Sequence, residues 1–329
     1  MRCTNRKRIL SFICMTLLIV CCLTGCGSLA YDMAYQVDHD ISSFNVVSRQ
    51  ESRTATPFAA DLCVTAGNVA RDESVDMAQA EAAALFGLNE REVLYAKNIH
   101  ERLHPASLTK VMTALVALEN GQLNQTLRAT GTVNITESGA VLCGLKSGDT
   151  MTLDQALRIL LVYSANDAAM LIAENIGGSV EHFVDMMNEK AHELGATNTN
   201  FTNPHGLTDS DHYTTVYDLY LIFNEAIKYD TFNEIIHMAS YQTVYYDKDG
   251  KEKSFEKSST NLYLQGNKQA PSNVTVIGGK TGTTNAAGHC LMLLARDESG
   301  APYISIVMRS ESTDSLYSEM YDLLDEIHK

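Results

Sequence analysis

Ser107 and Lys110 are three residues apart at the start of a stretch with helical hydrophobic spacing. On a helix, side chains at this spacing lie one turn apart on the same face. A serine hydroxyl is a weak nucleophile until a base takes its proton, and a lysine can be that base when burial or nearby charge lowers its pKa. The stretch 104–119 therefore predicts a helix that carries a nucleophile and its base, with apolar residues at Leu108, Val111, Met112, Leu115 and Leu118.

Two further short motifs follow this pair along the chain. Ser164-Ala165-Asn166 comes at the end of a predicted helix, and Lys280-Thr281-Gly282 lies in a predicted strand. Taken singly, each motif also fits a structural role: a helix N-cap with a solvated lysine, a helix end, or a surface turn. Taken together and in this order, they resemble the trio Ser-x-x-Lys, Ser-Asp-Asn and Lys-Thr-Gly of penicillin-binding proteins and class A β-lactamases, with Ala165 at the middle position of the second motif.

With these motifs, the sequence resembles the low-molecular-mass penicillin-binding proteins, which are serine D-alanyl-D-alanine carboxypeptidases. The resemblance covers about residues 80–329. It implies an α/β (α+β) fold of the β-lactamase/transpeptidase type: three layers with a central antiparallel sheet flanked by helices, and an all-helical subdomain. The active site would lie between sheet and subdomain. Flanking stretches that also resemble the family are Pro105-Ala-Ser-Leu-Thr-Lys110, Asn166-Asp-Ala-Ala169, Asn203-Pro-His-Gly-Leu207, His212-Tyr-Thr-Thr215 and Gly279-Lys-Thr-Gly-Thr283.

The resemblance also implies a role for each catalytic motif residue. Ser107 would attack a D-Ala-D-Ala peptide bond and form an acyl-enzyme, and Lys110 would accept its proton. Ser164 would relay a proton to the leaving D-alanine. Asn166 would hold both Lys110 and the amide of the substrate. Water would then release the acyl group, whereas a β-lactam would acylate the same serine and leave slowly.

The strand around the third motif would bind the substrate. Lys280 and Thr281 would bind the terminal carboxylate of the stem peptide, and Gly282 and Thr283 continue the same strand. The backbone N–H groups of Ser107 and Thr283 would form the oxyanion hole. This mechanism needs no cofactor. The sequence does not indicate which further residue binds the carboxylate.

The N-terminal 26 residues have the pattern of a bacterial lipoprotein signal. A basic start is followed by an apolar run over 9–23, which is too short for a membrane span, and then by Leu23-Thr24-Gly25-Cys26. We therefore expect a signal peptide over 1–25, a lipidated Cys26 with a tether over 26–79, and a catalytic domain over 80–329, exported and held at the outer face of the cytoplasmic membrane. An ordinary signal peptide with an incidental cysteine, or an uncleaved anchor, is the alternative.

Composition and residue spacing argue against a nucleic-acid partner, a disulfide framework and a metal site. The net charge of −15 argues against nucleic acid as a partner, because phosphate contacts need clustered Lys and Arg. Three cysteines remain beyond Cys26, so no disulfide framework is implied. His205 and His212 with the aspartates between them lack metal-ligand spacing, and no metal site is expected.

Three other functions share the motifs. A class A β-lactamase would need an acidic residue in a Glu-x-x-Leu-Asn pattern, which is absent between Asn166 and Lys280. A sensor lipoprotein would bind penicillin or peptidoglycan without turnover. A transpeptidase would pass the acyl group to an amine rather than to water.

The chain pattern predicts elements that alternate between strands and helices. A sheet built from distant segments, with helices inserted between them, follows from this order. Strands are expected over 61–69, 82–88, 92–96, 241–246, 253–257, 274–284, 289–295 and 303–308, and helices over 153–161, 167–175, 180–194, 215–227 and 315–327.

Overall fold

A computed structural model of the chain describes residues 59–70 and 75–328. These residues belong to a unit that spans residues 57–329. Within the described ranges, no helix is both long and apolar enough to cross a membrane. Buried apolar side chains form two clusters, one on each face of a central sheet.

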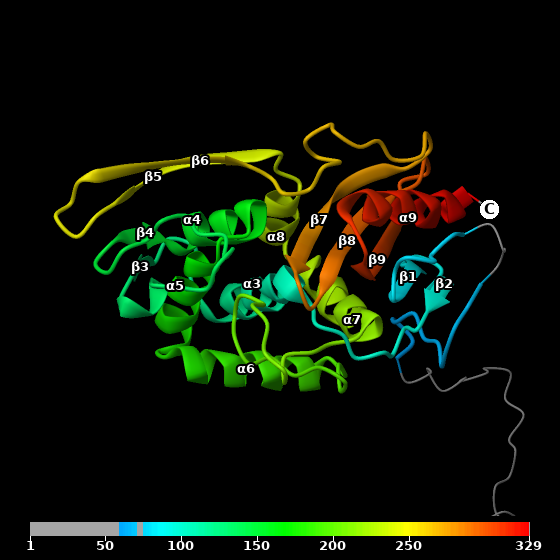
Figure 1. The fold of residues 1–329 in the computed structure, drawn as a ribbon, viewed down its shortest axis with the longest axis horizontal. Coiled ribbons are helices and arrows are strands. Elements are labelled where there is room, and N and C mark those ends of the chain that lie inside the picture. The colour runs from blue at the N-terminus through cyan, green and yellow to red at the C-terminus, as the bar shows by residue number, and fades with distance from the viewer. Residues whose placement is uncertain (1–58, 71–74, 329) are drawn as a thin grey trace, which may run out of the picture. The chain divides into compact units, whose positions relative to one another are not determined.

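The central sheet has five antiparallel strands in the order β2-β1-β9-β8-β7. Strands that are far apart in the sequence meet in it, because β1 pairs with β9. β7 is the edge strand that faces the helical subdomain (Figure 1). The strands are β1 (Ala82–Gly87), β2 (Glu92–Lys97), β7 (Thr275–Thr284), β8 (Gly288–Arg296) and β9 (Pro302–Ser310).

Successive side chains of a strand point to opposite faces of the sheet, and β1 shows this directly. Leu85 packs in the cluster of α9 (Thr313–Asp325). Phe86 packs on the other face, where its ring stacks on Tyr220 of α7 (Val216–Ala226) with the ring centroids 4.1 Å apart. Helix, sheet and helix therefore form three layers, as predicted.

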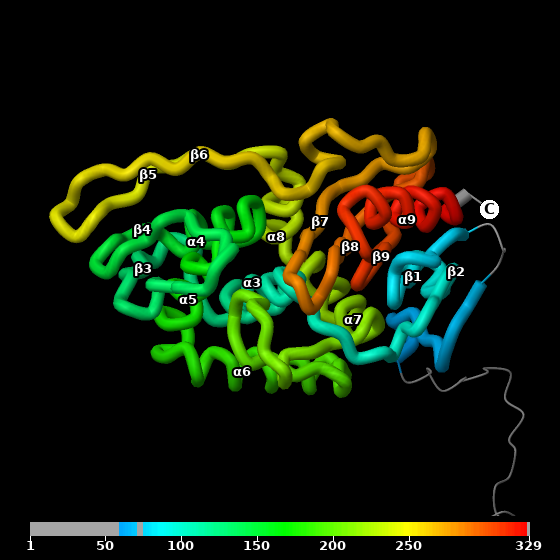
Figure 2. Tube along the Cα trace, viewed as in Figure 1, coloured from blue at the N-terminus to red at the C-terminus, as the bar shows by residue number. Residues whose placement is uncertain are grey.

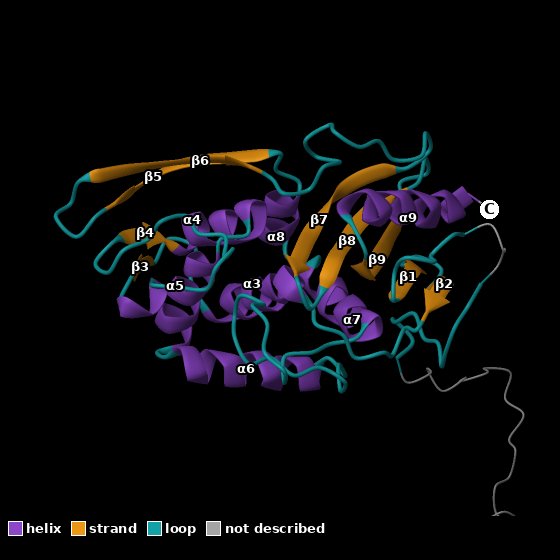
Figure 3. Ribbon diagram, viewed as in Figure 1, coloured by secondary structure: helices purple, strands orange, loops and turns teal. Residues whose placement is uncertain are grey.

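A helical subdomain adjoins the β7 edge of the sheet (Figure 3). Its central helix, α3, is buried at every residue from Lys110 to Ala117, so other elements surround it. The elements of the subdomain are the 3-10 turns η1 (Ala106–Thr109) and η2 (Gly131–Val133), α3 (Lys110–Asn120), α4 (Leu153–Arg158), the π-helical turn η3 (Ile159–Tyr163), α5 (Asn166–Gly177), α6 (Val180–Glu193) and α8 (Asp230–Ile236); a 3-10 turn, η4 (Glu326–His328), follows α9.

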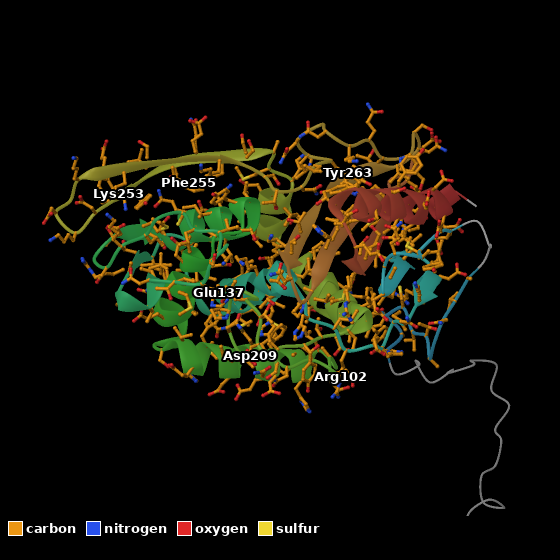
Figure 4. All side chains as sticks on the ribbon, in the orientation of Figure 1. Arg102, Glu137, Asp209, Lys253, Phe255 and Tyr263 are labelled. Carbon is orange, nitrogen blue, oxygen red and sulfur yellow. The ribbon has the colours of Figure 1, made fainter. Side chains whose placement is uncertain are left out.

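A second, smaller sheet covers the subdomain in the order β3-β4-β5-β6. Its long hairpin runs over α4 (Figure 2), and the Gln155 side chain of α4 donates hydrogen bonds to Thr243 Oγ1 and the Val244 carbonyl. Phe255 lies on this hairpin (Figure 4). Its side chain is buried, and its ring packs against Tyr163. The strands are β3 (Thr126–Arg128), β4 (Thr150–Thr152), β5 (Ser240–Tyr246) and β6 (Glu252–Ser258).

The structure departs from the predicted elements in a few places. The strand predicted over 61–69 is wrong: only an isolated bridge from Val69 to Ala96 forms. Part of the predicted tether packs on the domain, because the Cys63 N–H donates to the Tyr220 hydroxyl and Met77 is buried. The sequence does not predict β3, β4 and α8: strands of three residues are too short to show alternation, and the seven residues of α8 make only about two helical turns.

Candidate active site

Ser107 and Lys110 lie at the buried N-terminal end of α3. Ser107 sits in the η1 turn, and Lys110 is the first residue of the α-helix. The Lys110 side chain has no exposed surface, and its Nζ lies 2.9 Å from Ser107 Oγ. The predicted nucleophile and base are therefore in direct contact.

Three oxygen atoms surround the Lys110 nitrogen. Besides Ser107 Oγ, Nζ lies 2.6 Å from Asn166 Oδ1 and 2.6 Å from the His205 carbonyl oxygen. Burial lowers the pKa of Lys110 well below its usual value; the charge of Lys280 lowers it further, while Asp167 opposes the shift. A neutral amine has two N–H groups and one lone pair. The two carbonyl oxygens can only accept, so they take the N–H groups and leave the lone pair for the Ser107 hydroxyl proton.

A second lysine–serine contact lies beside the first. Lys280 Nζ donates to Ser164 Oγ at 2.9 Å and to the Thr281 carbonyl at 2.8 Å. Lys280 is buried, and burial lowers its pKa to about 7. Ser164 follows the π-helical turn η3 and has a left-handed backbone with φ 71°. Such conformations are uncommon for residues other than glycine and often mark functional sites.

Asn166, the third residue of the Ser164 motif, connects this motif to Lys110. Asn166 begins α5, its side chain contacts Lys110, and its N–H donates to the Val141 carbonyl at 2.8 Å. The buried Asp167 carboxylate accepts hydrogen bonds from the backbone N–H groups of three successive residues, Cys143, Gly144 and Leu145. These hydrogen bonds hold the loop that contains residues 143–145, which precedes β4, against the Ser164-Ala165-Asn166 motif.

The turn that presents Ser107 is strained and supported from behind. Ala106 has a left-handed φ of 47°. Its carbonyl accepts a hydrogen bond from the Thr109 hydroxyl at 2.8 Å. Thr109 Oγ1 in turn lies 2.8 Å from His212 Nε2. Burial lowers the pKa of His212 to about 4, and its Nδ1 accepts from the Thr202 N–H, so Nε2 carries the proton and donates to Thr109.

Two glycines allow close approach to this turn. Gly206 has φ 86°, and a Cβ atom there would lie 1.8 Å from the Ala106 carbonyl oxygen. On the opposite side, a Cβ atom at Gly282 of β7 would lie 3.0 Å from the Ser107 backbone nitrogen. The small glycine of the third motif thus lets the edge strand pack directly on the nucleophile turn.

A cavity of about 260 Å³ opens beside Ser107. It is also lined by Ser164 and by the strand residues Thr281, Gly282 and Thr283, so each of the three motifs contributes at least one residue to its wall. Three larger hollows, of about 470, 440 and 290 Å³, hold none of the motif residues and are not assigned to the site. The other lining residues are Val141, Thr260, Leu262, His289, Cys290, Thr313, Leu316 and Tyr317.

Sequence reasoning missed these other lining residues. They come from two loops, from β8 and from α9, and no short motif connects them. The Thr283–His289 strand pairing would have revealed one of them. In the ranges that the structure describes, no group of three His, Cys, Asp or Glu residues could hold a metal ion. Cys63, Cys143 and Cys290 are free thiols. The predicted lipidation residue Cys26 lies outside the described residues.

Comparison with known proteins identifies the class. The family model of D-alanyl-D-alanine carboxypeptidases, peptidase S11, matches residues 69–312. In solved structures, the DD-transpeptidase of Streptomyces K15 has this fold, with a TM-score of 0.70 at 27% identity over 76% of this chain and 97% of that chain. A penicillin-binding protein homologue from Mycobacterium tuberculosis has a TM-score of 0.67 at 30% identity, over 80% of this chain and 95% of that chain.

The chain belongs to the D-alanyl-D-alanine carboxypeptidase family, peptidase S11. It is 34% identical to the carboxypeptidase DacF of Bacillus subtilis over 75% of this chain and 61% of that protein. It is 32% identical to DacC of Escherichia coli over 82% of this chain and 64% of that protein. The match thus spans a little over three-fifths of the length of these two relatives.

The clearance at Gly206 yields a stability prediction. Gly206→Ala should lower the free energy of unfolding by more than about 3 kcal/mol, because the new methyl group overlaps backbone and the strained turn must move. Gly266→Ala is the matched control: Gly266 also has a left-handed φ, 75°, but open space around it, so only the backbone strain of about 1–2 kcal/mol applies. Urea unfolding measures both. Equal losses in the two variants would contradict the packing argument.

Proposed function

We propose that this protein is a serine D-Ala-D-Ala carboxypeptidase that removes the terminal D-alanine from peptidoglycan stem peptides. The observation that carries the proposal is the environment of Lys110: a buried amine that lies 2.9 Å from Ser107 Oγ and 2.6 Å from each of two carbonyl oxygens. This arrangement makes a base of a residue that is ordinarily protonated. Family membership supports the choice of substrate.

In the proposed acylation step, Ser107 Oγ attacks the carbonyl carbon of the penultimate D-alanine and its proton passes to Lys110 Nζ. The bond between that carbon and the D-alanine nitrogen breaks. The Ser164 hydroxyl, which accepts a hydrogen bond from Lys280, gives its proton to the leaving amine and regains one from the Lys110 ammonium, so Lys110 is neutral again before deacylation. The backbone N–H groups of Ser107 and Thr283 stabilise the oxyanion.

In the second step, water attacks the ester carbon, its proton returns through the same base, and Ser107 Oγ leaves with a proton. The edge position of β7 supports binding of an extended peptide, because the outer side of this strand has no partner strand in the described sheet. Among the described residues that line the cavity there is no carboxylate of the kind a class A β-lactamase uses. Slow release of a penicillin adduct is therefore expected.

A mass and turnover experiment tests the proposal. Brief exposure to benzylpenicillin should add one drug mass at Ser107, and a pentapeptide that ends in D-Ala-D-Ala should lose D-alanine. The Ser107→Ala variant should do neither. An adduct without D-alanine release would favour a sensor, and fast drug hydrolysis would favour a β-lactamase. Transfer of the acyl group to an added glycine would favour a transpeptidase. Absence of any adduct on folded protein would overturn the acyl-enzyme mechanism.

The pKa shifts of the two lysines predict a bell-shaped pH dependence of acylation by benzylpenicillin. On the acid side, the rate should rise with pH as Lys110, whose pKa is well below its usual value, loses its proton and becomes a base. On the alkaline side, the rate should fall above about pH 7 as Lys280 loses its positive charge. In Lys280→Arg the charge persists, so the alkaline fall should disappear. A wild-type rate that keeps rising to pH 9 would contradict this assignment.

We also propose that the protein is exported and lipid-anchored through Cys26 at the outer face of the cytoplasmic membrane. The basic start, the short apolar run and the Leu23-Thr24-Gly25-Cys26 sequence support this. In detergent phase separation of expressing bacteria, the wild-type protein should enter the detergent phase. The Cys26→Ser variant should not carry a diacylglyceryl group and should lose the lipid-dependent shift in mass. Wild-type protein that has an unmodified Cys26 would exclude the lipoprotein form.

A further inference from the structure

We propose that His289 is a specificity-determining residue that binds the C-terminal carboxylate of the substrate. This inference rests on the proposed carboxypeptidase function and names a residue that no sequence motif indicates. His289 lies on β8, where it pairs with Thr283 of β7, and its side chain lines the cavity beside Ser107. It is the only His, Lys or Arg among the described residues that line this cavity.

The terminus of the substrate requires such a group. A carboxypeptidase must recognise a free carboxylate next to the bond that it cleaves, and a charge-assisted hydrogen bond is the strong way to do so. Lys280 is the other cation of the region. However, its Nζ is held by Ser164 Oγ and the Thr281 carbonyl, and Lys280 itself is only 1% exposed. Lys280 is therefore placed to supply positive potential and to orient Ser164, but it does not line the cavity.

The surroundings of His289 form a polar end of the cavity. Its Nδ1 lies 3.4 Å from Thr283 Oγ1 and 3.3 Å from Thr313 Oγ1. Thr313 is the first residue of α9, so this end also lies at a helix N-terminus, where the macrodipole favours an anion. Leu316 and Tyr317, on the first turns of the same helix, provide an apolar wall next to it. A carboxylate and a small methyl group, the two features of a terminal D-alanine, match these two surfaces.

The hydrogen bonds of the ring determine which nitrogen can act. Threonine hydroxyls can donate to Nδ1, and the neutral imidazole then carries its proton on Nε2. Nε2 has no hydrogen-bond partner in the part of the chain that the structure describes. It can therefore donate to a carboxylate in the neutral ring, and both nitrogens donate in the protonated ring. His289 thus keeps a donor for the substrate in either state.

Two acyl donors that differ only in a free carboxylate measure how much that carboxylate contributes to turnover. N-benzoyl-D-alanyl thioglycolic acid ends in a free carboxylate, and its methyl ester has the same scissile thioester without that charge. The readout is the ratio of kcat/KM for the acid to kcat/KM for the ester, with the rate of Ser107→Ala subtracted. His289→Ala should lower this ratio about 10- to 100-fold, the usual effect of losing one hydrogen bond to a charged group.

Three further variants make the test specific. His289→Arg restores a cationic donor and should keep the ratio close to the wild-type value. His289→Asp should lower the ratio at least as far as His289→Ala, because it places a like charge beside the carboxylate, and it decides the question if His289→Ala does not fold. His182→Ala removes an exposed histidine of α6 and should leave the ratio unchanged.

The outcomes separate this inference from the proposed function. A ratio that falls in His289→Ala and His289→Asp and is kept in His289→Arg supports the role of His289. If wild type is acylated by benzylpenicillin and turns over both donors, but His289→Ala and His289→Asp keep the ratio within twofold, the inference is overturned and the proposed function stands. If wild type turns over neither donor and gives no penicillin adduct, the proposed function fails and the inference fails with it.

Discussion

The burial of Lys110 is the constraint on which the rest of the site depends. Burial of an ammonium group with no exposed surface costs free energy. Three oxygen atoms contact the Lys110 nitrogen, and burial lowers its pKa, which favours the neutral amine. Each oxygen comes from a different segment: Ser107 from the η1 turn, Asn166 from the start of α5, and the His205 carbonyl from a distant loop. The base therefore exists only when these segments are assembled.

The same requirement explains the strain around the site. Ala106 and Ser164 both have left-handed backbones, an uncommon conformation for residues with a Cβ atom. Each is held by surrounding structure: the Ala106 carbonyl by Thr109 and the close-packed Gly206, and the Ser164 hydroxyl by Lys280. Neighbouring packing stabilises both conformations, and in return the two serine hydroxyls point at the two lysine amines.

The two buried lysines contact different serines. Lys110 lies on the helical side and faces the nucleophile, whereas Lys280 lies on the edge strand and faces Ser164. The charge of Lys280 lowers the pKa of Lys110, whereas burial alone lowers the pKa of Lys280.

The sequence by itself determined the class of fold and the candidate residues of the site. Short motifs with local spacing contain Ser107, Lys110, Ser164, Asn166 and Lys280, and the long strands and helices have clear periodic patterns, so the linear sequence predicts both. Tertiary structure alone decided what surrounds them. The burial that lowers the Lys110 pKa, the π-helical turn before Ser164 and the place of His289 beside Thr283 arise from contacts between residues far apart in the chain. Such contacts depend on how strands and helices pack, and a one-dimensional pattern does not contain that packing.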